Sequence, residues 1–370
     1  MEARPGNKWQ FIAGGLVHTG SKQSLNKHAS LVAGNHCGEN IRHALGLIKE
    51  DLEPLLESRS VLIKPNLTAT KNIYSNTSAE ACEAVVEFLK NNHDDFRKME
   101  IIIGENSGSA FYEGVTTKKV FSDFKYDKIA KKYRNVKLAD FSDCKDFRAH
   151  EIENVAGKHM EILVCKDTEK FDYVISVAPP KTHNVAIYTG AVKNMMGLVK
   201  KEDMNKVHGM KIAGEDGSGK TLMDILPTGT IPWIRRRFPQ SAIDFAFMKY
   251  PNYKKSVKVI NRNIANVLQW YLPDLAVVDG MYGMEGNGPV DGTGVKLGVA
   301  VASTDALKAD GLGCRLMGIK PECVGYLHYL EEAGYGSLSN ENVIGGGVEH
   351  YSKKFKMHGT FPVQCEWDQL

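Results

Sequence analysis

The sequence has no long apolar run and little excess charge. No apolar stretch reaches the ~18 residues that a transmembrane helix needs. The opening residues, MEARPGNKWQF, lack the apolar core of a signal peptide. The 47 basic side chains nearly balance the 44 acidic ones, for a net charge of +3. These absences argue against a membrane partner and a nucleic-acid partner, so we expect a cytoplasmic protein.

The seven cysteines also lack the spacing of a structural framework. They are odd in number, lie far apart, and include no C-x-x-C pair. Disulfide scaffolds, zinc ribbons and ferredoxin-type clusters depend on recognisable cysteine patterns. We therefore expect neither a disulfide framework nor an iron–sulfur cluster. The metal cofactor to consider is a divalent ion, namely nickel, iron, manganese or magnesium.

Length and patterning predict an α/β fold. At 370 residues the chain exceeds the usual size of one hydrophobic core. Buried-strand patterns alternate with amphipathic helical ones, which is typical of largely parallel sheets covered by helices on both faces. We predict an N-terminal α/β lobe over residues 1–170, a C-terminal α/β lobe over residues 171–370, and an active site between them. A Gly-, Pro- and Arg-rich segment at about 209–255 is expected to form an inserted lid.

Polar side chains follow several predicted strands. In α/β sheets, ligands bind beyond the carboxyl ends of the strands. The ends of the strands near residues 61, 101 and 173 are therefore expected to meet a substrate. The predicted substrate-binding residues are Lys64, Asn66, Glu105, Asn106, Ser107, Asn184 and Asn194.

The stretch from residue 171 to 208 carries the densest set of reactive side chains. An apolar run at 173–178 predicts a buried strand, which Pro179 and Pro180 stop because proline gives a sheet no N–H. A helix is predicted at about 187–200, with Gly190 and Gly197 on the same face as a lysine and an asparagine. Glycine costs about 1 kcal/mol against alanine inside a helix. The two glycines therefore indicate that another group approaches the backbone closely.

Three side chains in this stretch suit acid–base chemistry. A histidine titrates near neutral pH and can move a proton or bind a metal. Lysines that converge on a pocket can hold a carboxylate and stabilise an enolate-like charge. We predict His183, Lys193 and Lys181 as the catalytic residues. Each of them, taken alone, also fits a structural or solvated role, and that alternative stays open.

A glycine-rich acidic run, residues 280–294, follows another predicted strand. Oxygen ligands on a flexible backbone suit magnesium or calcium. We predict metal ligation by Asp279, Glu285 and His208. The alternative for the acidic run is a tight, solvated turn.

Residues 214–221 match the phosphate-binding pattern G-x-x-x-x-G-K-T. Such a loop normally follows a buried strand, whereas the preceding residues, VHGMKIA, are too short and mixed for one. A P-loop phosphotransferase is therefore retained only as an alternative.

Three strings carry a family resemblance: KPN at 64–66, APPKTHN with TGAVKNMMGLV, and DGMYGMEGNGPVDGTG. From about residue 60 to 345 the chain resembles the family numbered 362 among the domains of unknown function. It is more distantly similar to the nickel-pincer lactate racemases. That second likeness implies that His183 is an acid/base, Lys193 a cofactor attachment point and His208 a nickel ligand. The sequence around the lysine reads TGAVKN and lacks the racemase pattern G-x-S-G-G-R-K.

Together these patterns predict an enzyme of the isomerase or lyase kind, or one related to oxidoreductases. It would perform metal-assisted acid–base chemistry, such as isomerisation, elimination or a related tailoring step, on an anionic carboxylate-bearing metabolite of specialised metabolism. A homodimer is compatible with the sequence. A non-catalytic metallocofactor-binding or maturation protein is the alternative outside enzymology.

Overall fold

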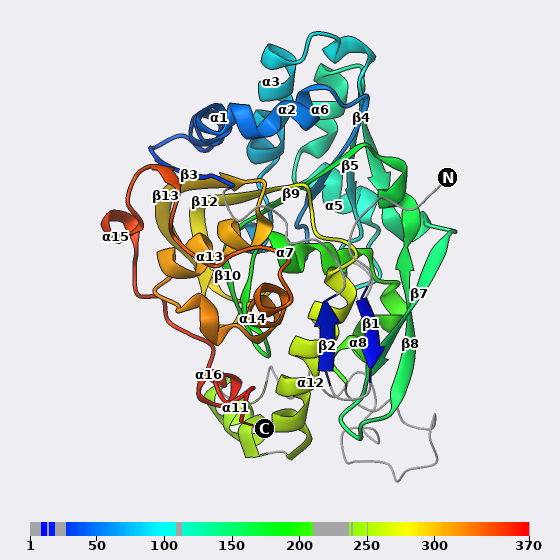
Figure 1. Ribbon diagram of the computed structural model, residues 1–370, viewed down its shortest axis with the longest axis vertical. Coiled ribbons are helices and arrows are strands. Elements are labelled where there is room, and N and C mark those ends of the chain that lie inside the picture. The colour runs from blue at the N-terminus through cyan, green and yellow to red at the C-terminus, as the bar shows by residue number, and fades with distance from the viewer. Residues whose placement is uncertain are drawn as a thin grey trace.

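The computed structural model describes residues 9–12, 15–18, 27–108, 113–209, 237, 240–249 and 251–369. Its centre is a ten-stranded sheet (Figure 1). In spatial order the main path consists of β14 (Val343–Gly345), β3 (Ala29–Ala33), β13 (Thr293–Ser303), β12 (Leu275–Glu285), β9 (Tyr173–Ala178), β4 (Ser60–Pro65), β5 (Glu100–Glu105) and β6 (Val136–Asp140). Neighbouring strands on this path run parallel, except that β13 is antiparallel to both of its neighbours. The predicted α/β class with a largely parallel sheet is confirmed.

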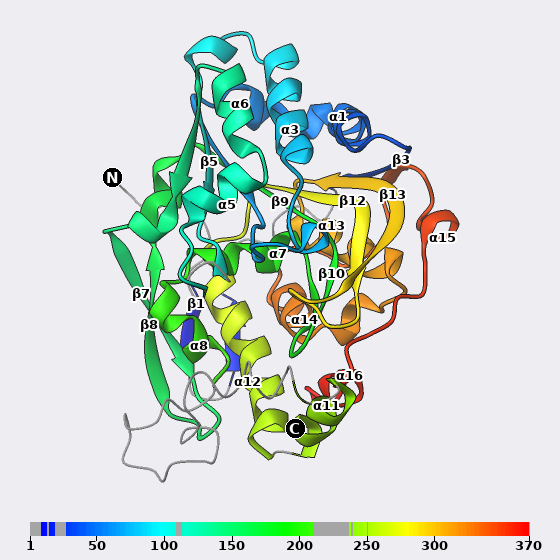
Figure 2. The same cartoon turned by 180° about the vertical axis from the view of Figure 1, so that it is seen from behind.

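The remaining strands lie outside this path. β10 (Lys181–His183) pairs with β11 (Ile187–Thr189) and, in parallel, with β12. β7 (Phe147–Glu153) and β8 (His159–Cys165) form an antiparallel hairpin that extends beside the main body (Figure 2). β1 (Trp9–Ile12) and β2 (Gly15–His18) form a separate antiparallel pair.

Alternate residues of the central strands face opposite cores. Val61 and Ile63 belong to one buried cluster, while Leu62 belongs to the other. This alternation follows from the two-residue period of a strand, so both faces of the sheet need a helical cover. One face packs against α1 (Cys37–Leu47), α3 (Ala79–Asn92), α5 (Thr117–Asp123) and α6 (Tyr126–Lys132), and the other against α7 (Ala191–Asn194), α12 (Pro251–Leu268), α13 (Ala306–Leu316) and α14 (Gly325–Glu332) (Figure 1).

The smaller helices are peripheral to these two layers. They are α2 (Glu53–Leu56), α8 (Met204–Val207), α11 (Gln240–Lys249), α15 (Val348–Tyr351) and α16 (Phe361–Gln364). Within the described ranges, no helix combines the length and apolarity that crossing a lipid bilayer requires.

Strands from both predicted lobes share the central sheet. β3, from the N-terminal half, lies between β14 and β13 of the C-terminal half, and β9 is hydrogen-bonded to β4. One sheet therefore runs through both halves, and the domain boundary at residue 170 stays a prediction. Most of the expected lid and all of the P-loop-like string at 214–221 lie outside the described residues.

The central stretch differs in part from its predicted structure. β9 ends at Ala178, directly before the two prolines, as expected. The helix predicted at 187–200 is wrong at its start, because residues 187–189 form β11 instead. Ile187 has a φ of 61° and lies opposite His183 in the β10–β11 hairpin. The helix begins only after Gly190 and continues as a 3-10 helix, Met195–Leu198.

The close approach to the two glycines comes from the protein's own side chains. A Cβ on Gly190 would lie 2.2 Å from Oδ1 of Asp310 and 2.4 Å from the hydroxyl of Tyr188. A Cβ on Gly197 would lie 2.8 Å from Nζ of Lys64. Both glycines are therefore required by packing around the start and end of this short helical segment.

We expect Gly190→Ala to destabilise the protein by about 1–3 kcal/mol, because its methyl group would overpack a filled site. Gly46→Ala is the matched control, since a Cβ there meets nothing within 4 Å in helix α1. That change should be neutral or stabilise by up to about 1 kcal/mol. Denaturant unfolding of the two variants measures both effects, and equal stability of the two variants would contradict this packing account.

Candidate active site

A cavity of about 370 Å³ lies where β4 and β5 end, beside the β10–β11 hairpin. This is the carboxyl edge of parallel strands, where α/β proteins commonly bind ligands. The predicted site residues that line it are Asn66, Glu105, Asn106, His183, Asn184, Lys193, Asn194 and His208. Residues 287–291 of the glycine-rich loop close another side of the cavity.

Lys64 lies directly behind the lining in a buried ion pair. Its Nζ is 2.8 Å from Oε1 of Glu105, and both side chains are almost fully buried. The same ammonium donates to Oδ1 of Asn194 at 3.3 Å, while the Asn194 amide donates back to the carbonyl of Lys64 at 2.9 Å. The other carboxylate oxygen of Glu105 accepts the N–H of Leu67 at 3.0 Å. Lys64 therefore positions lining residues and does not itself face the cavity.

Lys181 likewise lies behind the cavity lining and holds a lining residue in position. Its Nζ donates to Oδ1 of Asn66 at 2.9 Å and to the carbonyl of Ser75 at 2.6 Å. Burial, together with the charge of Lys193, lowers the pKa of Lys181 to about 7. Ser107 is also buried behind the lining, and within the described ranges its hydroxyl has no hydrogen-bond partner.

His183 presents its Nε2 side as a hydrogen-bond donor. Its Nδ1 accepts the N–H groups of Val185 at 3.1 Å and Ala186 at 3.2 Å. A nitrogen that accepts hydrogen bonds carries no proton, so the neutral ring holds its proton on Nε2. Burial, and next the charge of Lys193, keep the pKa of His183 well below its usual value. The ring is therefore suited to stabilise negative charge that develops on a substrate oxygen.

Lys193 is held at the start of α7 by a buried carboxylate. Asp310 accepts the N–H groups of Ala191 at 2.7 Å and Val192 at 2.9 Å. Burial raises the pKa of Asp310 to about 7. Burial also lowers the pKa of Lys193 to about 8, close to the working range of an acid–base catalyst.

Lys201, Thr189 and His358 line the cavity and were not predicted. Burial lowers the pKa of Lys201 to about 8, and its ammonium donates to the carbonyl of Asn106. Thr189 is buried, and its hydroxyl has no hydrogen-bond partner among the residues that the structure describes. The pair of lysines at 200–201 is only a weak indication in the sequence that one of them lines a binding cavity. No sequence pattern links His358, near the C-terminus, to the cavity-lining residues of the β10–β11 hairpin, which are more than 150 residues earlier in the chain.

The predicted metal ligands are not brought together. His208 lines the cavity, and burial followed by the charge of Lys193 lowers its pKa to about 4. Asp279 instead accepts from the thiol of Cys37 at 3.3 Å and the hydroxyl of Ser78 at 3.1 Å. Glu285 accepts the N–H of Lys356 at 2.8 Å. The cavity thus has no ready-made set of three metal-binding side chains among the described residues.

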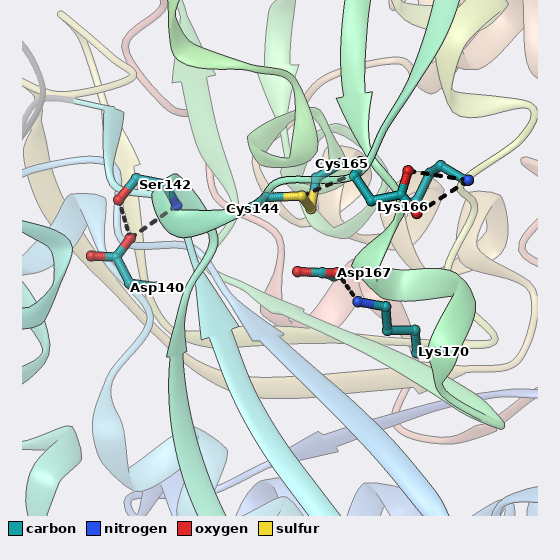
Figure 3. Close-up of a disulfide and its surroundings, with 8 residues drawn as sticks. Asp140, Ser142, Cys144, Cys165, Lys166, Asp167 and Lys170 are labelled. Carbon is teal, nitrogen blue, oxygen red and sulfur yellow. Dashed lines mark hydrogen bonds and ion pairs between the residues drawn. A yellow bond between two sulfur atoms is a disulfide. The ribbon is translucent and has the colours of Figure 1, made fainter.

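A disulfide joins Cys144 and Cys165, which are 21 residues apart (Figure 3). The cysteine spacing did not predict this bond. The β7–β8 hairpin places Cys165 opposite Phe147, close to Cys144, and that pairing is invisible in a list of cysteine positions. None of these residues lines the cavity.

Comparison with known proteins identifies the family. The model of the family described as "Domain of unknown function (DUF362)" matches residues 61–315, which is more than half of the chain. The protein therefore belongs to the DUF362 family, as the sequence strings predicted. No curated protein resembles the sequence closely enough to count as a match.

Among solved structures, the fold is similar to the lactate racemase apoprotein from Thermoanaerobacterium thermosaccharolyticum. The sequence identity is 11% and the TM-score is 0.45. The match covers 85% of this chain, which spans 63% of the racemase chain.

We expect Lys193→Met to stabilise the protein, because it removes a charge that burial disfavours. The unfolded chain binds more protons than the folded one between pH 8 and 10.5, so wild-type stability rises with pH across that window. At pH 7 the variant should be more stable by on the order of 1–3 kcal/mol. The difference should shrink as the pH rises from 8 to 10.5, and it should vanish above that range, where the lysine is neutral in both the folded and the unfolded chain.

Denaturant unfolding at pH 7 and pH 10 measures this effect. Lys255→Met, on the exposed side of α12, is the matched control and should change stability by less than about 0.5 kcal/mol. A Lys193→Met variant that loses stability at pH 7 would contradict the expected burial cost.

Proposed function

We propose that the protein is an enzyme that moves a proton on an anionic, carboxylate-bearing metabolite, in an isomerisation, elimination or related tailoring reaction. One observation supports this most strongly: the cavity combines a buried lysine, Lys201, and a half-buried lysine, Lys193, with a neutral histidine donor. No carboxylate in the described part of the chain forms an ion pair with Lys193 or Lys201. Buried cations without anionic partners favour the binding of an anion, which offsets the cost of their burial.

The three side chains have different roles in this proposal. The ammonium of Lys201 holds the substrate carboxylate. Lys193, in its neutral form, takes the proton from the carbon next to that carboxylate and later returns it. The Nε2–H of His183 donates to the oxygen on which the negative charge develops. The hydrogen bonds at Nδ1 favour this donor role over the base role first considered for His183.

The proposal predicts exchange of substrate hydrogen with solvent. The protein is incubated in D₂O with a mixture of carboxylate metabolites, and mass spectrometry detects deuterium at carbon. Lys193→Arg keeps a positive charge but is a poor base, so exchange should fall at least about 10²-fold while carboxylate binding persists. His183→Gln should slow exchange by about 10²–10³-fold.

Lys255→Arg is the matched control, because it makes the same substitution at an exposed lysine. This variant should exchange substrate hydrogen with solvent at the wild-type rate. If no carboxylate gains deuterium with the wild-type protein, proton transfer from carbon is not its chemistry. Binding without exchange would then favour the non-catalytic alternative.

A second candidate is the same chemistry assisted by a divalent metal. Its support is His208, whose ring nitrogens make no hydrogen bond to any residue in the described ranges. A metal held there would need its other ligands from the substrate or from an organic cofactor. It would supply Lewis-acid stabilisation of the substrate oxygens.

Elemental analysis tests this candidate. Near-stoichiometric nickel, iron or manganese in the wild-type protein should disappear in His208→Ala and persist in His350→Ala, a control away from the cavity. Equal content of these three metals in the two variants would contradict the metal-assisted version without affecting the exchange prediction.

A further inference from the structure

A second cluster of reactive side chains lies at the open end of the β7–β8 hairpin, outside the cavity. Cys144 precedes β7, Cys165 ends β8, and Asp167 belongs to the 3-10 helix Lys166–Lys170 that follows. One ligand atom from each of the three lies within 4.8 Å of the other two. Cys165 is buried, and the other two are half-buried (Figure 3).

We propose that Cys144, Cys165 and Asp167 form a zinc site when their disulfide is reduced. Two thiolates and a carboxylate are a ligand set that zinc prefers, with bonds of about 2.3 Å to sulfur and 2.0–2.2 Å to oxygen. A tetrahedral ion with such bonds holds its ligand atoms roughly 3.3–3.8 Å apart. The three ligand atoms lie within 4.8 Å of one another, so this spacing needs only small shifts once the S–S bond is broken. A water molecule takes the fourth place.

Positively charged side chains lie close to the proposed zinc–thiolate site. Zinc with two thiolates and one carboxylate carries a net charge of −1. Lys170 forms an ion pair with Asp167, and Nζ of Lys166 is 3.2 Å from the carboxylate of Asp146 (Figure 3). Lys170 lies beside a ligand carboxylate and partly offsets the negative charge of the centre.

Disulfide and zinc exclude each other at this site. A dithiol reductant supplies two electrons and two protons, breaks the S–S bond and leaves as its own disulfide. Zinc then replaces the two thiol protons and forms two Zn–S bonds. Either closure fixes the end of β8, whose Leu163 accepts the N–H of Lys200 at 2.8 Å. The next residue is Lys201, so both closures support the segment that enters the cavity.

Cobalt(II) titration of the full-length protein tests the proposal. The protein is reduced with a phosphine, freed of reductant under nitrogen and titrated with cobalt(II), whose thiolate complexes absorb in the near ultraviolet. We expect one equivalent of cobalt, displaced by one equivalent of zinc, in the reduced protein and none in the oxidised protein. Cys144→Ser and Cys165→Ser should lose the absorbance, and Asp167→Asn should weaken zinc binding at least about 10-fold.

Cys323→Ser is the matched control, because Cys323 is a free, half-buried cysteine elsewhere in the fold. It should bind cobalt as the wild type does. The oxidised wild type and Asp167→Asn keep the test valid if a cysteine variant folds poorly. Reduced wild-type protein that binds no cobalt or zinc, or Cys144→Ser protein that binds as much as wild type, would overturn the proposal. Neither result bears on hydrogen exchange at the cavity.

Discussion

The buried ion pair between Lys64 and Glu105 is the interaction on which the cavity depends. It joins the carboxyl ends of two adjacent strands at 2.8 Å and engages Asn194 on the helix that carries Lys193. Gly197 is required because any side chain there would collide with Lys64. Removing one partner of such a pair typically costs about 3–5 kcal/mol, since the other charge is left buried and unpaired. The pair therefore fixes the floor of the site and leaves other lysines to meet a ligand.

Stability and function make opposite demands on the two lysines that line the cavity. Lys201 is buried and Lys193 is half-buried, and neither forms an ion pair with a carboxylate in the described ranges. Removal from water lowers the pKa values of both lysines and costs folding free energy. A structural role would favour an apolar side chain at either position. The cost is understandable if an anion completes the site, because a bound carboxylate would stabilise the charged form of Lys201, which is proposed to hold it. The neutral ring of His183, which lines the same cavity, adds an N–H donor that needs no proton transfer before it can donate.

Local sequence signals predicted the sheet well and the site only in part. The proline pair ends β9, because this effect acts between near neighbours. The helix expected at 187–200 was misplaced because the hairpin turn at Ile187 depends on tertiary contacts. His358 and the pairing of Cys144 with Cys165 arise from distant segments, and no local pattern records them. Asp279 was expected where a strand ends, but β12 continues past it to Glu285, and hydrogen bonds from Cys37 and Ser78 satisfy its carboxylate away from the cavity.

The most direct test of the account is the pKa of Lys193, measured by NMR with labelled lysine and assigned with Lys193→Arg. We predict that its ammonium titrates near pH 8, below the ordinary value of 10.5, and that adding acetate raises this pKa. Acetate is a suitable probe because it carries a carboxylate and little else. A pKa near 10.5 without acetate, or one that acetate leaves unchanged, would contradict the claim that a half-buried lysine, with no carboxylate ion-pair partner among the described residues, prepares this cavity for an anion.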